Sequence, residues 1–115
     1  MRSEKEPAGM NAQFKKGVLD LCVLTLVASR DYYGYELVEE ISRSIEISEG
    51  TIYPILRRLT QEGYFETYLE ESPAGPPRKY YRISRRGRAA QGEMIADWSN
   101  FVRGISRLLK TGEKS

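Results

Sequence analysis

Residues 48–63 read SEGTIYPILRRLTQEG, and this stretch predicts a short helix with two unlike faces. Ser48 suits the N-terminal cap because its hydroxyl can accept the early free backbone N–H groups, and Gly63 is a typical C-terminal stop. Pro54 falls beyond the first turn, where a proline loses one backbone bond, so we expect either a start near Gly50 or a bend. The apolar residues recur at helical spacing and form an inner stripe of Ile52, Ile55, Leu56 and Leu59.

The outer face of the same helix is polar and basic. At about 100° per residue, the residues that point away from the inner stripe are Gly50, Tyr53, Pro54, Arg57 and Gln61, and Thr51 and Arg58 lie on its flank. Hydroxyl and guanidinium groups can bind phosphates or base edges, and arginine paired with guanine is the commonest specific contact. Gly50 would let a phosphate approach the helix start, where free N–H groups favour an anion. By itself such a face is weak evidence, because many solvated helix faces are similarly mixed.

Two further helices are predicted before this one. Residues 14–29 are apolar on most sides, which is typical of a central core helix, and we interpret Cys22 within them as a small core residue. Residues 31–34 break that pattern. The amphipathic helix that follows has its apolar residues at helical spacing, at Tyr35, Leu37, Val38, Ile41 and Ile45.

A β-hairpin is predicted after the capped helix. Residues 64–71 and 78–84 have β character, with Tyr81 and Ile83 facing the core, and the segment SPAGPP at 72–77 has the composition of a turn. From the second strand onward comes a run of six basic residues with no acidic one between them, namely Arg78, Lys79, Arg82, Arg85, Arg86 and Arg88. A basic hairpin beside a basic helix favours a phosphate-binding surface over a patch that only aids solubility.

A long helix is predicted from beyond Gly87 to about Lys110. Its apolar residues are spaced 4, 3, 4 and 3 apart, which is a heptad seam, and they are Met94, Trp98, Phe101, Ile105 and Leu108. A helix of roughly 35 Å, at about 1.5 Å per residue, is too long for the small core to cover, so we expect a homodimer through this seam. Trp98 either fills that interface or stacks with its symmetry mate around a flat aromatic effector.

The composition excludes several classes of function. The chain has 115 residues, one cysteine and no histidine. An intramolecular disulfide, a zinc or iron–sulfur site and a catalytic pair built on histidine are therefore excluded, and we expect no metal, no cofactor and no enzyme activity. No apolar run approaches the roughly 20 residues of a membrane span, and a lone cysteine fits a reducing cytosol, so we expect a cytoplasmic protein.

The elements divide the chain into three parts. We expect a flexible N-terminal tail over residues 1–13, a DNA-binding domain over residues 14–86 and a dimerisation helix over residues 87–111. The order helix, helix, capped helix, hairpin, helix is the winged helix-turn-helix arrangement. The predicted fold class is thus mainly α (α+β), a winged helix-turn-helix domain with a long C-terminal dimerisation helix.

Four segments occur together in a specific order and spacing: KGVL at 16–19, YGYEL at 33–37, GTIYPILRRL at 50–59 with Glu62-Gly63, and ESPAGPPRKYY at 71–81 followed by Ser84 and Gly87. In this combination the chain resembles the PadR family of transcriptional regulators, in its short type with a single C-terminal helix. The resemblance implies a homodimeric DNA-binding protein, usually a repressor, that reads a palindromic operator. The third helix would enter the major groove, and the hairpin, or wing, would reach the minor groove or backbone. Some short members bind flat aromatic or drug-like compounds at the dimer centre.

The residues that we expect to bind double-stranded DNA come from the first three helices and the wing. They are Lys15, Tyr35, Ser48, Gly50, Thr51, Tyr53, Pro54, Arg57, Arg58, Arg78, Lys79 and Tyr80. The seam residues are expected to form the dimer and to hold any effector. The alternative hypothesis is a winged-helix protein-interaction module that never binds DNA, but such modules lack a basic wing.

Overall fold

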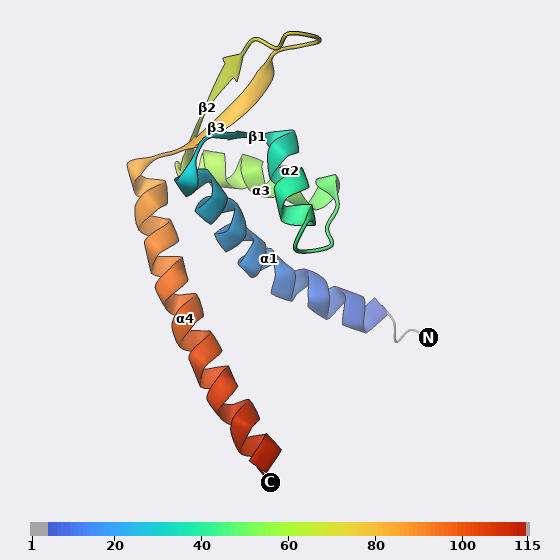
Figure 1. Cartoon of the computed structure of the whole chain (residues 1–115), viewed down its shortest axis with the longest axis vertical. Helices are drawn as coiled ribbons and strands as arrows, with labels where there is room; N and C mark the ends of the chain where they lie inside the picture. Colours follow the sequence, from blue (N-terminus) through green and yellow to red (C-terminus); the bar gives the residue numbers. More distant parts are fainter. Residues whose placement is uncertain (1–4, 115) are drawn as a thin grey trace.

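The computed structural model describes the backbone of residues 5–114 and the side chains of residues 17–112. Its elements, in chain order, are α1 (Lys5–Ser29), β1 (Tyr32–Tyr33), α2 (Gly34–Ser42), α3 (Glu49–Gln61), β2 (Phe65–Glu70), β3 (Arg78–Ile83) and α4 (Arg85–Lys114). Figure 1 shows a hairpin of β2 and β3 projecting beyond the helices, with α4 extending away on the other side. The predicted order of the helices and the hairpin and the mainly α fold class are confirmed, whereas β1 is a strand where the sequence indicated only a break between helices. Among the residues described, no helix combines the length and apolar character that crossing a bilayer needs.

One apolar core lies where α1, α2, α3 and the base of the sheet meet. Its helical members are Leu19, Val23, Leu24 and Val27 of α1, Leu37, Val38 and Ile41 of α2, and Ile52, Ile55, Leu56 and Leu59 of α3. The predicted inner stripe of α3 is thus wholly buried, and Tyr81 and Ile83 face the core as predicted. Cys22 is half-buried, and burial raises the pKa of its thiol, which suits a packing residue better than a nucleophile. Because the inner stripe is buried, the polar face of α3 points outward.

Helix α1 begins at Lys5, ahead of the apolar pattern from which its start was predicted. Its first turns therefore fall inside residues 1–13, for which we expected a flexible tail. Residues 1–4 lie outside the described part of the chain, as do the side chains up to residue 16. The flexibility of this stretch stays a prediction.

The C-terminal end of α3 is closed by the residue that the sequence indicated. Gly63 has a φ of +85°, a left-handed conformation that favours glycine. Its N–H donates to the carbonyl of Thr60, and the next N–H, that of Tyr64, donates to the carbonyl of Leu59, both at 3.0 Å. This pair of bonds is the Schellman motif, and it confirms Gly63 as the stop signal of the helix.

The N-terminal end of α3 differs from the prediction. Ser48 occupies the N-cap position, as predicted, with an extended backbone. Its side chain does not form the capping hydrogen bond that we expected, so that part of the prediction is wrong. Its hydroxyl instead lies 3.3 Å from the hydroxyl of Thr51. The helix begins at Glu49, one residue before the start near Gly50 that was one of the two arrangements expected from Pro54. Pro54 then falls in the second turn, where its missing N–H removes the bond to the carbonyl of Gly50.

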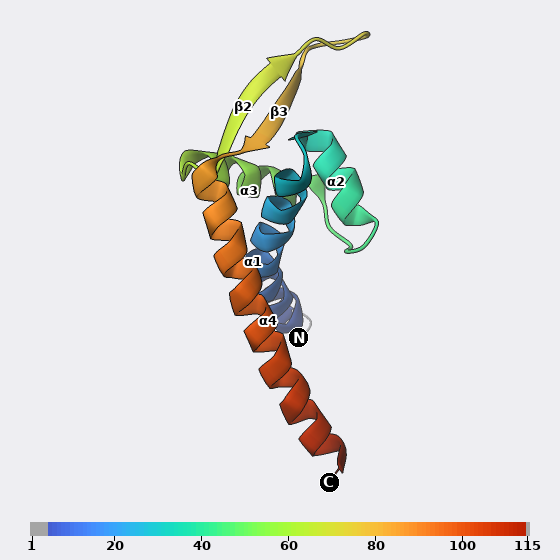
Figure 2. The same ribbon diagram turned by 60° about the vertical axis from the view of Figure 1, so that its left-hand side comes forward.

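The three strands form an antiparallel sheet in the order β1-β3-β2. In its register Tyr33 of β1 and Tyr68 of β2 flank Tyr80 of β3 on either side. Phe65, at the base of β2, is buried, whereas Leu69, nearer the turn, is 69% exposed. Figure 2 shows the reason, because the hairpin extends well beyond the helices that cover its base. The wing is therefore a projecting ribbon whose base alone belongs to the core.

Helix α4 starts at a fixed place beside the end of α3. The hydroxyl of Ser84 donates to the carbonyl of Gly63 at 2.6 Å and accepts the N–H of Gly87 at 3.0 Å. A Cβ on Gly87 would stand 2.3 Å from the carbonyl oxygen of Tyr64, so only glycine fits there. From this point α4 runs close to α1 near the wing and then diverges from it (Figure 1).

Candidate nucleic-acid interface

The outer face of α3 and the inner face of the wing line a shared hollow. Its volume is about 220 Å³, and the residues around it are Tyr53, Arg57, Thr60, Gln61, Lys79 and Tyr81. The ammonium group of Lys79 lies 5.8 Å from the centre of the Tyr81 ring, on the side of the wing that faces α3. The fold thus brings a basic residue of the wing opposite Arg57, as the sequence indicated.

A second hollow, of about 520 Å³, adjoins the first. It lies between the start of α2, the ring of Tyr53 and the turn of the wing, and its lining includes Tyr33, Tyr35, Tyr53, Pro77, Arg78 and Lys79. The Arg78 guanidinium lies 4.6 Å above the Tyr33 ring, and Tyr35 is 49% exposed. The two hollows share Tyr53 and Lys79, so together they form one concave surface, which we call the α3–wing surface.

The exposed cations of the α3–wing surface are Arg57, Arg78 and Lys79. Among the side chains of residues 17–112, no ion pair includes Arg57, Arg78 or Lys79, and all three are exposed. They can therefore meet phosphate oxygens without breaking an ion pair with a described carboxylate.

Tyr53 stands between the two hollows and is 36% exposed. Burial raises the pKa of its phenol, and the nearby charge of Glu49 raises it further. The hydroxyl is therefore protonated at neutral pH and can donate a hydrogen bond to a phosphate or a base edge.

The start of α3 supplies the remaining exposed polar groups. Ser48, Gly50, Thr51 and Pro54 are all exposed there, and the hydroxyls of Ser48 and Thr51 face one another. The side chain of Lys15 lies outside the described residues, so its expected role stays a prediction.

Arg58 is held differently from its neighbour Arg57. One guanidinium nitrogen donates to Asp20 of α1 at 2.8 Å, and the other lies 4.0 Å from a carboxylate oxygen of Glu62. The side chain of Arg58 is 34% exposed. The hydrogen bond to Asp20 raises the pKa of Arg58 further above its usual value. The positive charge of Arg58 is thus paired with carboxylates of the protein itself.

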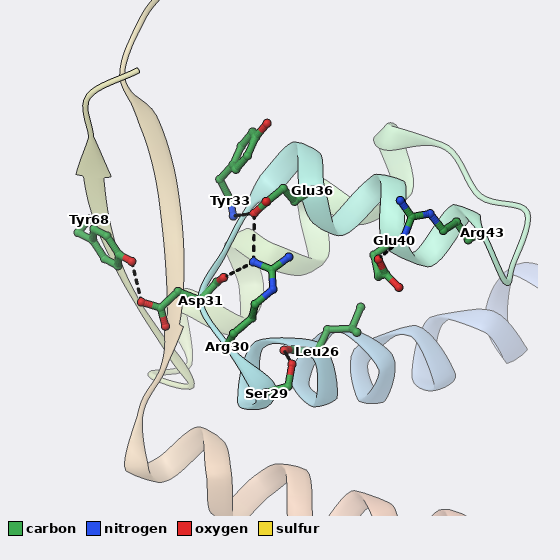
Figure 3. A network of polar contacts seen from close by, with 9 residues as sticks. All are labelled: Leu26, Ser29, Arg30, Asp31, Tyr33, Glu36, Glu40, Arg43 and Tyr68. Atoms are coloured by element: carbon green, nitrogen blue, oxygen red, sulfur yellow. Dashed lines mark hydrogen bonds and ion pairs between the residues drawn. The ribbon is translucent and has the colours of Figure 1, made fainter. Parts of the chain in front are cut away.

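Tyr80 lies on the opposite side of the wing from Lys79, in a row of aromatic rings. Its ring stacks on Tyr68 at 5.5 Å and 12°, and it meets Tyr33 at 5.5 Å in a tilted arrangement. The Tyr68 hydroxyl donates to Asp31 at 2.6 Å, which Figure 3 shows as a link between β2 and the segment after α1. Sequence reasoning missed this row, because only the strand register brings the three rings together.

The junction of β1 and α2 is fixed by a second set of contacts in Figure 3. A carboxylate oxygen of Glu36 accepts the backbone N–H of Tyr33 at 3.1 Å and lies 3.5 Å from the Arg30 guanidinium. The Arg30 guanidinium also lies 3.7 Å above the Tyr32 ring. These contacts hold Tyr33, and with it the place of Arg78, against the body of the domain.

The predicted seam of α4 is largely uncovered within one chain. Met94 is partly buried against the core, whereas Trp98, Phe101, Ile105 and Leu108 are between 37% and 71% exposed. Trp98 and Phe101 also border a hollow of about 540 Å³ between α1 and α4, the α1–α4 hollow, which Val18, Asp20 and Asp97 line as well. Large apolar side chains exposed in a row are unusual on a monomer and typical of an interaction surface.

Comparison with known proteins places this geometry in a family. The model of the "Transcriptional regulator PadR-like family" matches residues 23–93. The transcriptional regulator Rv3488 of Mycobacterium tuberculosis is 33% identical over 70% of this chain and 76% of its own length.

Solved structures agree. The PadR-like transcriptional regulator of Bacillus cereus strain ATCC 14579 is 36% identical with a TM-score of 0.77, covering 84% of this chain and 96% of that one. The PadR family regulator of Eggerthella lenta DSM 2243 is 30% identical with a TM-score of 0.78, covering 94% of this chain and 96% of that one. The chain therefore belongs to the PadR-like family of transcriptional regulators.

Proposed function

We propose that this protein regulates transcription by binding an operator sequence through the α3–wing surface. The observation that carries the proposal is the placement of Arg57 opposite Lys79, both exposed and neither in an ion pair within the described residues. Helix α3 enters the major groove, where Arg57 and Gln61 read base edges and Tyr53 binds the backbone. The wing places Arg78 and Lys79 on phosphates beside it.

The functional unit in this proposal is a homodimer formed through α4. The exposed seam of Trp98, Phe101, Ile105 and Leu108 has the heptad spacing with which helices pair. Two copies related by a two-fold axis present two α3 helices to two half-sites, so the operator is palindromic.

The outcome of binding in this proposal is repression, which a small aromatic or drug-like effector relieves. The support is Trp98 at the border of the α1–α4 hollow, whose volume of about 540 Å³ lies within the range of small-molecule sites. The effector must bind one dimer arrangement more tightly than the other, because otherwise it shifts nothing. The protein acts in the cytoplasm and needs no metal or cofactor.

The test is selection of bound duplexes from fragmented genomic DNA, followed by titration of the selected sequence at several salt concentrations. We expect a pseudo-palindromic consensus and a binding constant that falls steeply with salt, with a slope of about 0.9 for each phosphate bound. A chain that binds no duplex at low salt, or binds with an affinity that salt does not change, would be an interaction module instead. Reporter expression with and without the protein then separates repression from activation.

A further inference from the structure

An ion pair joins α1 to the DNA-facing helix α3. A guanidinium nitrogen of Arg58 lies 2.8 Å from a carboxylate oxygen of Asp20, and the two side chains are only 34% and 15% exposed. Water screens a partly buried pair less than a fully exposed one, so the pair holds its geometry more firmly. Arg58 is the immediate neighbour of Arg57 on α3. The pair therefore fixes the helix at the position from which Arg57 faces the α3–wing surface.

Asp20 also borders the α1–α4 hollow. It lines this hollow together with Trp98 and Phe101 of the seam. The other carboxylate that lines the hollow is Asp97, and the other carboxylate near Arg58 is Glu62, at 4.0 Å. Asp20 thus lines the hollow that Trp98 and Phe101 border and also pairs with Arg58 of α3.

We propose that Asp20 and Arg58 are a positioning pair that couples the α1–α4 hollow to the orientation of α3. This inference rests on the proposed function. Arg58 acts through Arg57 by holding the helix, and it is not itself a phosphate ligand. A change in the hollow that moves Asp20 also moves α3. Because coupling between two sites is reciprocal, DNA binding at α3 in turn changes the surroundings of Trp98.

The competing account is that Arg58 leaves Asp20 when DNA arrives and binds a phosphate. The two accounts predict opposite signs for the variant Asp20→Asn. If Arg58 is a positioning residue, removal of the Asp20 charge loosens α3 and weakens operator binding. If Arg58 is a phosphate ligand held back by Asp20, the same variant frees its charge and strengthens binding.

The first experiment measures the affinity of full-length variants for the selected operator. Asp97→Asn is the matched control, because it removes one negative charge from the same hollow without touching Arg58. We expect Asp20→Asn to bind about 3- to 10-fold more weakly and Asp97→Asn to stay within about twofold. The exchanged pair, Asp20→Arg with Arg58→Asp, should recover most of the affinity, which would not happen if Arg58 were a phosphate ligand. Binding by Asp20→Asn that is unchanged or tighter overturns the proposal.

The second experiment needs no DNA. Trp98 is the only tryptophan in the chain, so the emission spectrum of the protein reports on the hollow. We expect Arg58→Gln to shift that emission, because Asp20 is released beside Trp98, and Glu62→Gln to leave it unchanged. If the wild-type protein binds no DNA but the emission responds, the proposed function fails and the coupling stands. If the emission does not respond to Arg58→Gln, the coupling is overturned whether or not DNA binds.

Discussion

The ring of Tyr53 on α3 lies against Gly34 at the start of α2. A Cβ on residue 34 would stand 2.7 Å from Cε1 of that ring, a distance that real Cβ atoms do not tolerate. The glycine therefore lets α3 carry its tyrosine at the boundary of both hollows of the α3–wing surface. The same contact gives a physical reason for glycine between the two tyrosines of the segment Tyr33-Gly34-Tyr35.

Replacing Gly34 by alanine should separate DNA binding from stability. The ring of Tyr53 is the far end of a side chain and can swing away, so we expect the melting temperature to change little. The displaced Tyr53 hydroxyl can no longer reach the DNA backbone. The free energy of operator binding should therefore become less favourable by about 1 kcal/mol, the typical net value of one hydrogen bond. Thermal unfolding and anisotropy titration check this, with Gly17→Ala, where nothing lies within 4 Å, as the control. Unchanged affinity would show that Tyr53 does not touch DNA.

Arg57 and the wing cations should differ in how they contribute to binding. Arg57→Ala should cost about 1–3 kcal/mol on the operator and relax base preference at one position of each half-site. Arg78→Ala with Lys79→Ala should weaken binding to operator and random duplex alike, and should reduce the salt slope by about 0.9 for each phosphate that is no longer bound. Titrations of both variants on both duplexes at several salt concentrations check this. If Arg57→Ala weakened binding to the operator and to random duplex equally, Arg57 would not contact base edges.

A charge placed in the seam should break the dimer. Phe101→Glu puts a carboxylate where we expect the partner helix to pack, so analytical ultracentrifugation should show monomers and operator binding should disappear. Ala96→Glu is the control, because at about 100° per residue Ala96 lies on the opposite side of α4 and is exposed. A dimer that survives Phe101→Glu would place the interface elsewhere.

The bond from Tyr68 to Asp31 should make wing stability depend on pH at the alkaline end. This hydrogen bond raises the pKa of Tyr68 above its ordinary value, which means that folding favours the protonated phenol. The stabilisation is therefore complete below the ordinary pKa of about 10 and is lost as pH rises through the raised value. Unfolding of the wild type and of Tyr68→Phe should differ at neutral pH and converge above that value. If the difference in stability between the wild type and Tyr68→Phe stayed constant across the whole alkaline range, this prediction would be wrong.

Gly87 should be among the positions least tolerant of substitution. Its Cβ would lie 2.3 Å from the Tyr64 carbonyl oxygen, and this neighbour is backbone that cannot swing aside. We expect Gly87→Ala to lower the free energy of unfolding by about 1–3 kcal/mol. In the same helix Gly92 has nothing within 4 Å, so Gly92→Ala should be neutral or stabilising. Calorimetry of the two variants checks the contrast.

Much of the fold could be predicted from local patterns. The inner stripe of α3, the stop at Gly63 and the core positions Tyr81 and Ile83 follow from periods of 3.6 and 2 and from the conformational freedom of glycine. The expected capping bond of Ser48 was wrong, because its hydroxyl pairs with the hydroxyl of Thr51 instead. Such local competition between hydrogen-bond partners is not encoded in spacing.

The sequence by itself determined which faces are apolar and which carry cations, since both depend only on residue type and on the geometry of a helix or strand. Helical spacing placed Arg57 on the outer face of α3 and Arg58 on its flank, but it could not show which of the two forms an ion pair. Only the tertiary structure set Asp20 within reach of Arg58 and left Arg57 outside the ion pairs of the described side chains. It likewise brought Tyr68, Tyr80 and Tyr33 into one row through the strand register. Contacts between residues far apart in the chain depend on how the elements pack, and that packing is set by the whole core at once.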